Sequence, residues 1–388
     1  MTPPGSEREH RWSRVRAGMS EARIDCLIVV GNAGLNLYRL ADLHYLTGMA
    51  REGVLLFPLE GEPVMLSFGG GHDPSAWVTD HRNGYPRFAE GILGIIADRG
   101  WDKATFGALL SGYEGDLNFP LRVQQAMAHA FPDAALVDAA PILASVRRIK
   151  TDFEIQCFKA GCEVGLRAIA AVAERARQGV SDLDVKTELM GTLFSNGCAS
   201  HTLLLFHSGN RSVHGAMGGS LPSPTGRTLE AGDVINTEFD AMFEGYCAQF
   251  NQPFFLGEVD GTYETIAAIG AECFAVGVDA LKPGLTAGEL QARMRGPVEA
   301  HGYQALGPMF HGLGLSFEPP IAQTSLGTSL PEDLDIVFEP GMVVELEPHV
   351  VAPDFSRGCS IGCPVLVTES GCETLAGDWK AEPVRIAG

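Results

Sequence analysis

Three stretches in the second half of the chain decide its fold: GDVINTEFDAMFEGYCAQFNQPFF (232–255), FHGLGLSFEPP (310–320) and FEPGMVVELEPHVV (338–351). In the first stretch, the alternation of a strand places Glu238 and Asp240 on the same face. In the third, the same alternation places Glu345 and Glu347 on one face. A carboxylate that points inward from a central strand needs a partner, because burying it unpaired is costly. These stretches therefore predict a polar site within a β-rich domain.

The first part of the chain has a different organisation. Residues 8–145 alternate strand-like apolar runs with helix-like segments, which is typical of an α/β domain. A long helix then begins, for which Thr151 is the expected N-cap and Glu154 its capping-box partner. Two helix pairs, each followed by strands, make up the remainder. We therefore predict two domains, 1–145 and 146–388.

The order and spacing of the three stretches resemble the creatinase, prolidase and methionine aminopeptidase superfamily (peptidase family M24). The second stretch is similar to its G-H-G-I-G motif and the third to its P-G-M-x-x-x-x-E-P motif. VLVTESG (365–371) resembles the closing strand, while HYLTG (44–48) and RRIKTDFEI (147–155) resemble parts of the creatinase-type N-terminal domain. The resemblance implies a creatinase-like architecture, with an α/β N-terminal domain followed by an α+β C-terminal domain of the pita-bread fold.

Metallopeptidases of this superfamily hold two divalent ions with Asp, Asp, His, Glu and Glu side chains. Carried over position by position, these ligands fall on Glu238, Gln249, His311, Glu347 and Gly362. Gln249 is neutral and Gly362 has no side chain, so two anionic ligands of a dinuclear centre are missing. We therefore expect no metal cofactor. The alternative is a single divalent ion held by Glu238, His311 and Glu347, since three protein ligands and a water can suffice.

Other polar residues are candidates for catalysis. His311 precedes a Gly-Leu-Gly turn that permits close backbone approach to a ligand, and an imidazole there could protonate a leaving nitrogen. His214 falls near the place where relatives carry a catalytic histidine, although it could instead lie on a glycine-rich surface loop. The expected catalytic set is His311, Glu347, Glu238 and His214.

The expected substrate-binding residues are a carboxylate, two amides, a guanidinium and an imidazole: Asp240, Gln249, Asn251, Arg211 and His349. The carboxylate can bind a substrate cation, and the amides can fix a carbonyl or carboxylate group. The planar guanidinium of Arg211 is suited to bidentate binding of a substrate carboxylate.

The missing ligands favour metal-independent members of the superfamily, which resemble creatinase or ectoine hydrolase. The predicted function is therefore hydrolysis of a non-peptide C–N bond in a small nitrogenous or zwitterionic compound. Three alternatives stay open: a lyase on a related small substrate, a divergent mononuclear Xaa-Pro metallopeptidase, and a catalytically inactive binding protein.

Composition narrows the range of partners. The 388 residues carry 48 acidic against 28 basic side chains, a net charge of −20, which argues against nucleic acid and anionic membranes as partners. Nine scattered cysteines, no apolar leader and no long apolar run favour reduced thiols in a cytoplasmic protein without membrane spans. The resemblance further implies a homodimer in which the N-terminal domain completes the partner's site.

Overall fold

The computed structural model describes residues 3–32, 40–67, 77–84, 87–111, 120–198, 204–213, 225–322 and 331–387. Two compact units share the chain, namely Met1–Arg147 with Leu315–Phe317, and Arg148–Gly314 with Glu318–Gly388. The domain boundary expected at 145/146 stays a prediction. None of the helices in the described ranges has the length and apolar character needed to cross a membrane.

The first unit is built on a six-stranded sheet with the order β4-β3-β2-β1-β5-β6. Its strands are β1 (Cys26–Gly31), β2 (Gly53–Pro58), β3 (Val64–Ser67), β4 (Asp80–Asn83), β5 (Thr105–Ala108) and β6 (Ala135–Asp138). Its helices are α1 (Gly5–Ala22), α2 (Ala41–Thr47), α3 (Phe88–Arg99), α5 (Leu121–Ala130) and α6 (Ala140–Arg148). Ile92 and Ile96 of α3 and Met127 of α5 pack with strand residues in one apolar core. This is the expected α/β N-terminal domain.

The second unit begins with α7 (Asp152–Arg175) and α8 (Asp182–Ser195). Thr151 caps α7 as expected, since its Oγ1 accepts from Glu154 N at 3.3 Å and its own N–H donates to Glu154 Oε2 at 2.9 Å. The other carboxylate oxygen of Glu154 accepts from Tyr246 Oη at 3.0 Å, which ties the start of the helix to a strand. The capping box therefore determines where α7 begins, and the hydrogen bond between Glu154 and Tyr246 attaches this end of the helix to the strand.

We expect Thr151→Ala to lower the free energy of unfolding by about 1 kcal/mol, because the variant loses the side-chain acceptor of the capping box. Urea unfolding followed by circular dichroism measures the change. Thr286→Ala is the matched comparison, because it removes the same kind of side-chain acceptor from the capping box of another helix, α10 (Ala287–Ala300). A Thr151→Ala protein as stable as the wild type would contradict this account of the helix start.

Three sheets form the body of the second unit, with the orders β18-β9-β8-β7, β12-β11-β13-β16-β17 and β10-β14-β15. The strands of the first sheet are β7 (Leu204–Gly209), β8 (Val234–Phe243), β9 (Tyr246–Leu256) and β18 (Val384–Ile386). Those of the second are β11 (Phe310–Leu313), β12 (Phe317–Ala322), β13 (Val343–Leu346), β16 (Cys363–Val367) and β17 (Cys372–Thr374). The third contains β10 (Gln304–Ala305), β14 (His349–Val351) and β15 (Gly358–Ser360).

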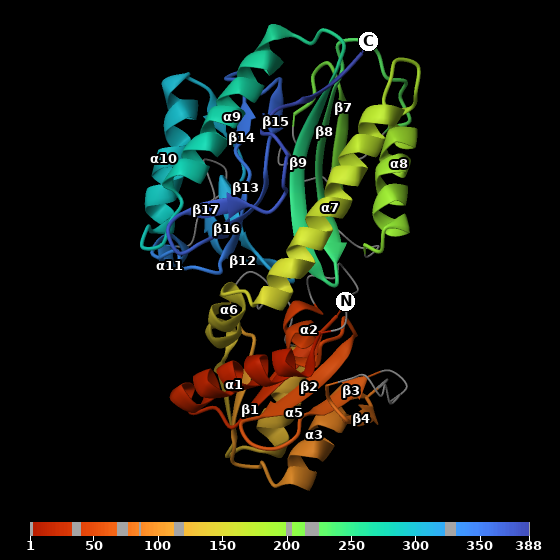
Figure 1. Ribbon diagram of the computed structural model, residues 1–388. Coiled ribbons are helices and arrows are strands. Elements are labelled where there is room, and N and C mark those ends of the chain that lie inside the picture. Colours follow the sequence, from red (N-terminus) through yellow and green to blue (C-terminus); the bar gives the residue numbers. More distant parts are fainter. Residues whose placement is uncertain are drawn as a thin grey trace. The chain divides into compact units, whose positions relative to one another are not determined.

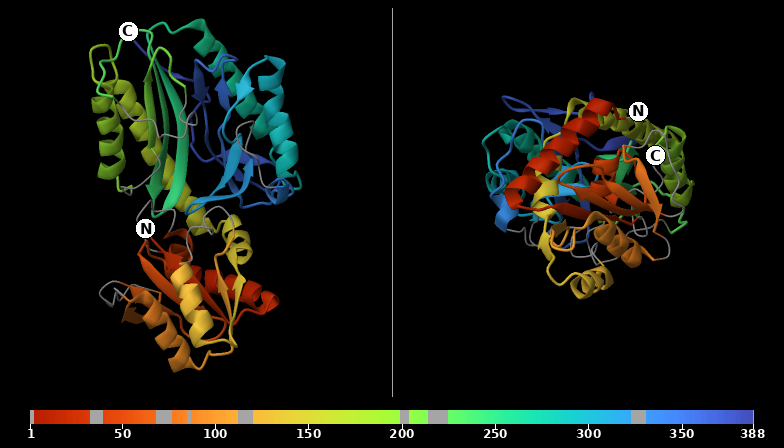
Figure 2. Two further views of the ribbon diagram at one scale, coloured as in Figure 1. Left: turned by 180° about the vertical axis from the view of Figure 1, so that it is seen from behind. Right: turned by 90° about the horizontal axis from the view of Figure 1, so that it is seen from below.

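Helices cover the outside of these sheets. The pair α7 and α8 lies along the β7–β9 side, and α9 (Gly261–Ala280) and α10 (Ala287–Ala300) lie on the opposite side, with the short α11 (Pro331–Leu334) below (Figure 1; Figure 2, left). Gly165 of α7 lies so close to the Phe250 ring that no side chain fits there. Strands held between two helix pairs are the pita-bread arrangement expected from the resemblance.

The hairpin expected at 232–255 is present as β8 and β9, which pair antiparallel over their whole lengths. Its two-residue turn is Glu244–Gly245, and both residues have positive φ (51° and 85°), the conformation of a tight hairpin turn. The register pairs Glu238 with Asn251 and Asp240 with Gln249. All four side chains therefore lie on the same face of this ribbon.

Candidate active site

Eight buried polar side chains of the second unit gather between the β8–β9 ribbon and the sheet that carries β11 and β13: Glu238, Asp240, Gln249, Asn251, His311, Glu345, Glu347 and His349. β11 pairs with β13, so that His311 lies opposite Glu345. Glu347 follows β13, and His349 begins β14. Backbone hydrogen bonds between Asn251 and Gly362 (3.0 and 3.1 Å) join the two sheets.

Glu347 is the centre of this cluster. Its Oε1 lies 3.3 Å from His311 Nε2, and its Oε2 lies 3.3 Å from His349 Nε2. Gln249 Nε2 also donates to Glu347 Oε2, at 2.9 Å. The side chain is 2 % exposed, so these contacts are made away from bulk water.

The two imidazoles set the charge state of Glu347. Burial alone would raise the pKa of Glu347, but the charges and hydrogen bonds of His311 and His349 outweigh it and lower that pKa to about 2. Burial would likewise lower the pKa of His311 and of His349. The charge and hydrogen bonds of Glu347 act against burial, and the pKa of each imidazole is raised. Glu347 is therefore an ionised carboxylate held between two imidazoles.

Glu238 is joined to Glu347 by amide groups. Asn251 Nδ2 donates to Glu238 Oε2 at 3.2 Å, and Gln249 Nε2 donates to Glu238 Oε1 at 3.3 Å. Because Gln249 also contacts Glu347, its amide nitrogen bridges the two carboxylates. Among the described residues, the Gln249 Oε1 atom is buried and has no hydrogen-bond partner.

Three of these residues could hold one metal ion. One ligand atom from each of Glu238, Glu347 and His349 lies within 4.8 Å of the other two. Two carboxylates and an imidazole suit a divalent ion of the manganese to zinc series. A rotation of the Gln249 amide would bring its oxygen to the place of Nε2, between Glu238 and Glu347, as a further ligand. This donor set fits one ion. It contains His349, whereas the sequence predicted His311 as the ligand beside Glu238 and Glu347.

Glu345 is a carboxylic acid that the sequence analysis did not include in the site. It is 0 % exposed, and neither of its oxygens has a hydrogen-bond partner within the described ranges. Burial and the nearby Glu347, Asp240 and Glu238 raise the pKa of Glu345 well above its usual range. The alternation that places Glu345 on the same face as Glu347 was the sequence signal that could have identified it.

We expect Glu345→Met to raise the free energy of unfolding of the cation-free protein by about 1–3 kcal/mol, since a buried polar group without a partner is replaced by an apolar one of similar size. Chemical denaturation in the presence of a chelator measures the difference. Glu369→Met, at an exposed position, is the control. A Glu345→Met protein less stable than the wild type would show that the carboxyl group has a partner.

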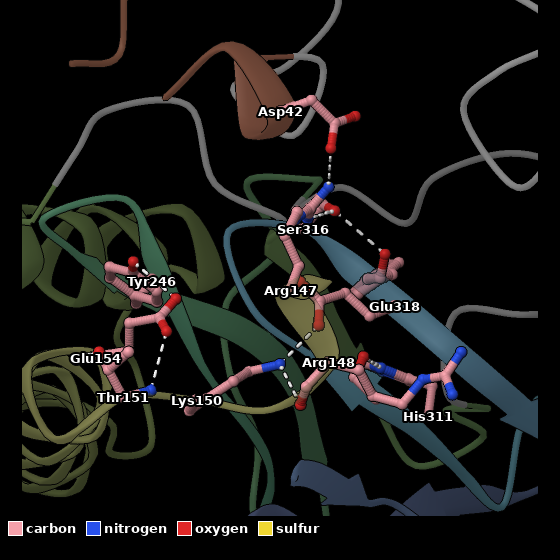
Figure 3. Close-up of polar contacts among 12 residues, drawn as sticks. Asp42, Arg147, Arg148, Lys150, Thr151, Glu154, Tyr246, His311, Ser316 and Glu318 are labelled. Atoms are coloured by element: carbon pink, nitrogen blue, oxygen red, sulfur yellow. Dashed lines mark hydrogen bonds and ion pairs between the residues drawn. The ribbon is translucent and has the colours of Figure 1, made fainter. Parts of the chain in front are cut away.

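The Gly-Leu-Gly turn after His311 was expected to let a ligand approach the backbone. Instead, the space above Gly314 is filled by the carboxylate of Glu318, which leaves no room for a side chain at position 314. Lys150 Nζ lies 2.5 Å from Glu318 Oε2 and 3.2 Å from the Arg148 carbonyl oxygen (Figure 3). The turn therefore accommodates a buried ion pair, and the expectation of ligand approach at Gly314 was wrong.

The roles expected of two further site residues, Arg211 and His214, are not tested by the described structure. Arg211 is exposed on the turn that follows β7, and its role in binding a carboxylate stays a prediction. His214 lies outside the described residues, so its catalytic role also stays a prediction. The cysteines are all buried except Cys372, which is half-buried.

Comparison with known proteins agrees with this fold. Residues 156–369 match the model of metallopeptidase family M24, and residues 11–149 match the creatinase/prolidase N-terminal domain. The chain therefore belongs to metallopeptidase family M24, a family of hydrolases. This confirms the resemblance and the two-part architecture expected from the sequence.

The relatives include proteins named creatinase and proteins named Xaa-Pro dipeptidase. The chain is 25 % identical to a creatinase from Bacillus sp. over 370 residues, which covers 91 % of this chain and 85 % of the relative. It is 27 % identical to an Xaa-Pro dipeptidase from Pyrococcus furiosus over 241 residues, or 60 % of this chain and 64 % of the relative. The solved structure of an Xaa-Pro dipeptidase from Bacillus anthracis aligns with 98 % of this chain and 100 % of its own at a TM-score of 0.79 and 23 % identity.

Proposed function

We propose that this protein hydrolyses the amide C–N bond of a small dipeptide-like substrate, with a single divalent cation held by Glu238, Glu347 and His349. The observation that carries the proposal is the convergence of these three ligand atoms within 4.8 Å. Relatives named as Xaa-Pro dipeptidases support an amide substrate. We therefore favour a mononuclear Xaa-Pro metallopeptidase, which the sequence left open as an alternative. The hydrolysis of a non-peptide C–N bond, which the sequence predicted first, becomes the second candidate.

A bound divalent cation would supply Lewis-acid polarisation of the scissile carbonyl group. Glu347, whose pKa is about 2, stays ionised over the physiological pH range and so remains available as an anionic ligand. His311 Nδ1 lies 3.0 Å from the Gly312 carbonyl oxygen, which can only accept, so Nδ1 carries a proton. Because the pKa of His311 is raised, its Nε2 atom also carries a proton, which it donates to Glu347 and can transfer to a leaving nitrogen.

A second candidate is the metal-independent hydrolysis of a non-peptide C–N bond. The specific observation in its favour is the Gln249 amide nitrogen, which bridges Glu238 and Glu347 at 3.3 and 2.9 Å. In this arrangement two N–H groups take the place that a cation would have between the carboxylates. The similarity to a protein named creatinase supports the same reading.

Product analysis with and without a chelator separates the two candidates. Purified protein is incubated with a panel of Xaa-Pro dipeptides and with guanidino and amidine compounds, and products are identified by mass spectrometry. Dipeptide cleavage that EDTA abolishes and Mn²⁺ restores is the result expected from the first proposal. Chelator-resistant cleavage of a non-peptide C–N bond would favour the second, and no cleavage of either class would contradict both.

A further inference from the structure

A small pocket of the first unit is lined by two thioethers and an imidazole. Its lining residues are Thr47, Met49, Arg51, Met65, Val78 and His81. Met65 of β3 and His81 of β4 are register partners on neighbouring strands, so their side chains point to the same face of the sheet (Figure 1). Met49 reaches the pocket from the turn that follows α2. Three segments of the chain therefore bring two sulfur atoms and a ring nitrogen around one pocket.

The imidazole of His81 has a lone pair that no described group uses. Its Nε2 atom lies 2.8 Å from the Val78 carbonyl oxygen, which can only accept, so Nε2 carries a proton. In the neutral ring Nδ1 is then unprotonated, and this atom is buried without a hydrogen-bond partner in the described ranges. Buried polar atoms are almost always paired. The ring therefore offers a nitrogen ligand atom to a group that the pocket could take up.

Contacts within the protein hold the two methionine segments in place. Met65 is 2 % exposed, and a Cβ atom at Gly53 of β2 would lie 2.6 Å from Met65 Cε, so the thioether fills the space that the glycine leaves. Thr47 Oγ1 accepts from Met49 N at 3.3 Å and donates to the Leu43 carbonyl oxygen at 2.7 Å. The turn that carries Met49 is thereby tied to the end of α2.

The chemistry of the lining residues indicates which ion they suit. Thioether sulfur is a soft, polarisable ligand that selects Cu(I), and imidazole nitrogen also binds copper. None of the described lining residues carries a carboxylate, the ligand that hard dications prefer. The positive charge of Arg51 repels a dication more strongly than a monovalent ion. These properties favour a soft ion with a single charge.

We propose that Met49, Met65 and His81 form a binding site for a soft monovalent metal ion, Cu(I). The ligand atoms are the two Sδ atoms and His81 Nδ1. All three residues belong to the first unit, whereas the residues of the candidate active site belong to the second. The inference is therefore independent of the proposed function, and the failure of one leaves the other standing.

Titration of the full-length protein with Ag(I), a redox-stable substitute for Cu(I), tests the site. Accessible thiols are first alkylated, and NMR of protein labelled at the methionine ε-methyl groups then reports thioether coordination directly. We expect the methyl signals of Met49 and Met65, assigned with Met49→Leu and Met65→Leu, to shift together until one equivalent is bound. Met65→Leu and His81→Phe should each bind Ag(I) at least about tenfold more weakly, since even the loss of a group that supports a ligand typically costs about 10–100-fold in metal affinity.

Two substitutions on α5 of the same unit are the matched controls. Met127→Leu replaces a buried methionine and His129→Phe an exposed histidine, and both should keep the wild-type affinity for Ag(I). Thermal unfolding checks that each variant is folded. If His81→Phe does not fold, Met65→Leu decides the question, because Leu and Met are similar in volume. The inference is overturned if neither methyl signal shifts, as in a pocket that holds only water, or if folded Met65→Leu binds Ag(I) as tightly as the wild type.

Discussion

Replacing Glu347 with glutamine is expected to reduce kcat for amide hydrolysis by about 10²–10⁴-fold, the range found when a positioned acid–base group or its partner is lost. Glu347 contacts His311 and His349 at 3.3 Å each and is one of the three residues proposed to hold the cation. The substitution removes the negative charge that raises the pKa of both imidazoles. It therefore disables the cation site and the proton donor together.

Steady-state kinetics with a cleaved dipeptide measures this effect. Glu339→Gln is the matched control, because Glu339 is exposed and lies on the same segment of chain. The control should retain wild-type kcat and KM. A Glu347→Gln protein that unfolds at the wild-type temperature and retains full turnover would show that the chemistry is assigned to the wrong residue.

The largest expected effect on stability comes from Lys150. Its Nζ atom lies 2.5 Å from Glu318 Oε2, and the two side chains are 1 % and 4 % exposed. Lys150→Met leaves the Glu318 carboxylate buried without this cation, and breaking a buried pair in this way typically costs about 3–5 kcal/mol. Urea unfolding of the variant measures the loss in the free energy of unfolding.

The double variant Lys150→Met/Glu318→Gln removes both charges and is the control. It should recover a large part of the lost stability, because replacing both partners of a buried pair is often close to neutral. If the single variant is as unstable as expected but the double variant recovers nothing, packing rather than charge explains the loss. A single variant with wild-type stability would contradict the role of the pair.

Local patterns were sufficient to predict much of this fold. The T-x-x-E pattern at Thr151 predicted the start of α7, and alternation predicted that Glu238 and Asp240 share a face of the β8–β9 ribbon. These features depend on residues that are near neighbours in sequence. The order of the three stretches supported the resemblance to the superfamily, and the resemblance predicted the fold of the whole second unit.

The features that could not be predicted depend on contacts between distant segments. Lys150 and Glu318 are 168 residues apart, so no local pattern reveals that a glycine turn accommodates their ion pair. The replacement of His311 by His349 in the candidate metal trio depends on side-chain distances across β11, β13 and β14. Both histidines were site candidates from the sequence, but the grouping of His349 with Glu238 and Glu347 depends on the folded arrangement.

The proposed stoichiometry of one cation is the central claim. The most direct measurement is calorimetric titration of the chelator-stripped protein with Mn²⁺, confirmed by elemental analysis after dialysis, for the wild type and for His349→Ala and Glu238→Gln. The account predicts one ion bound per chain by the wild type and at least about tenfold weaker binding by either variant, since even the loss of a group that supports a ligand typically costs about 10–100-fold in metal affinity. A wild type that binds no Mn²⁺, or that binds two ions, would contradict it, as would binding that neither substitution weakens.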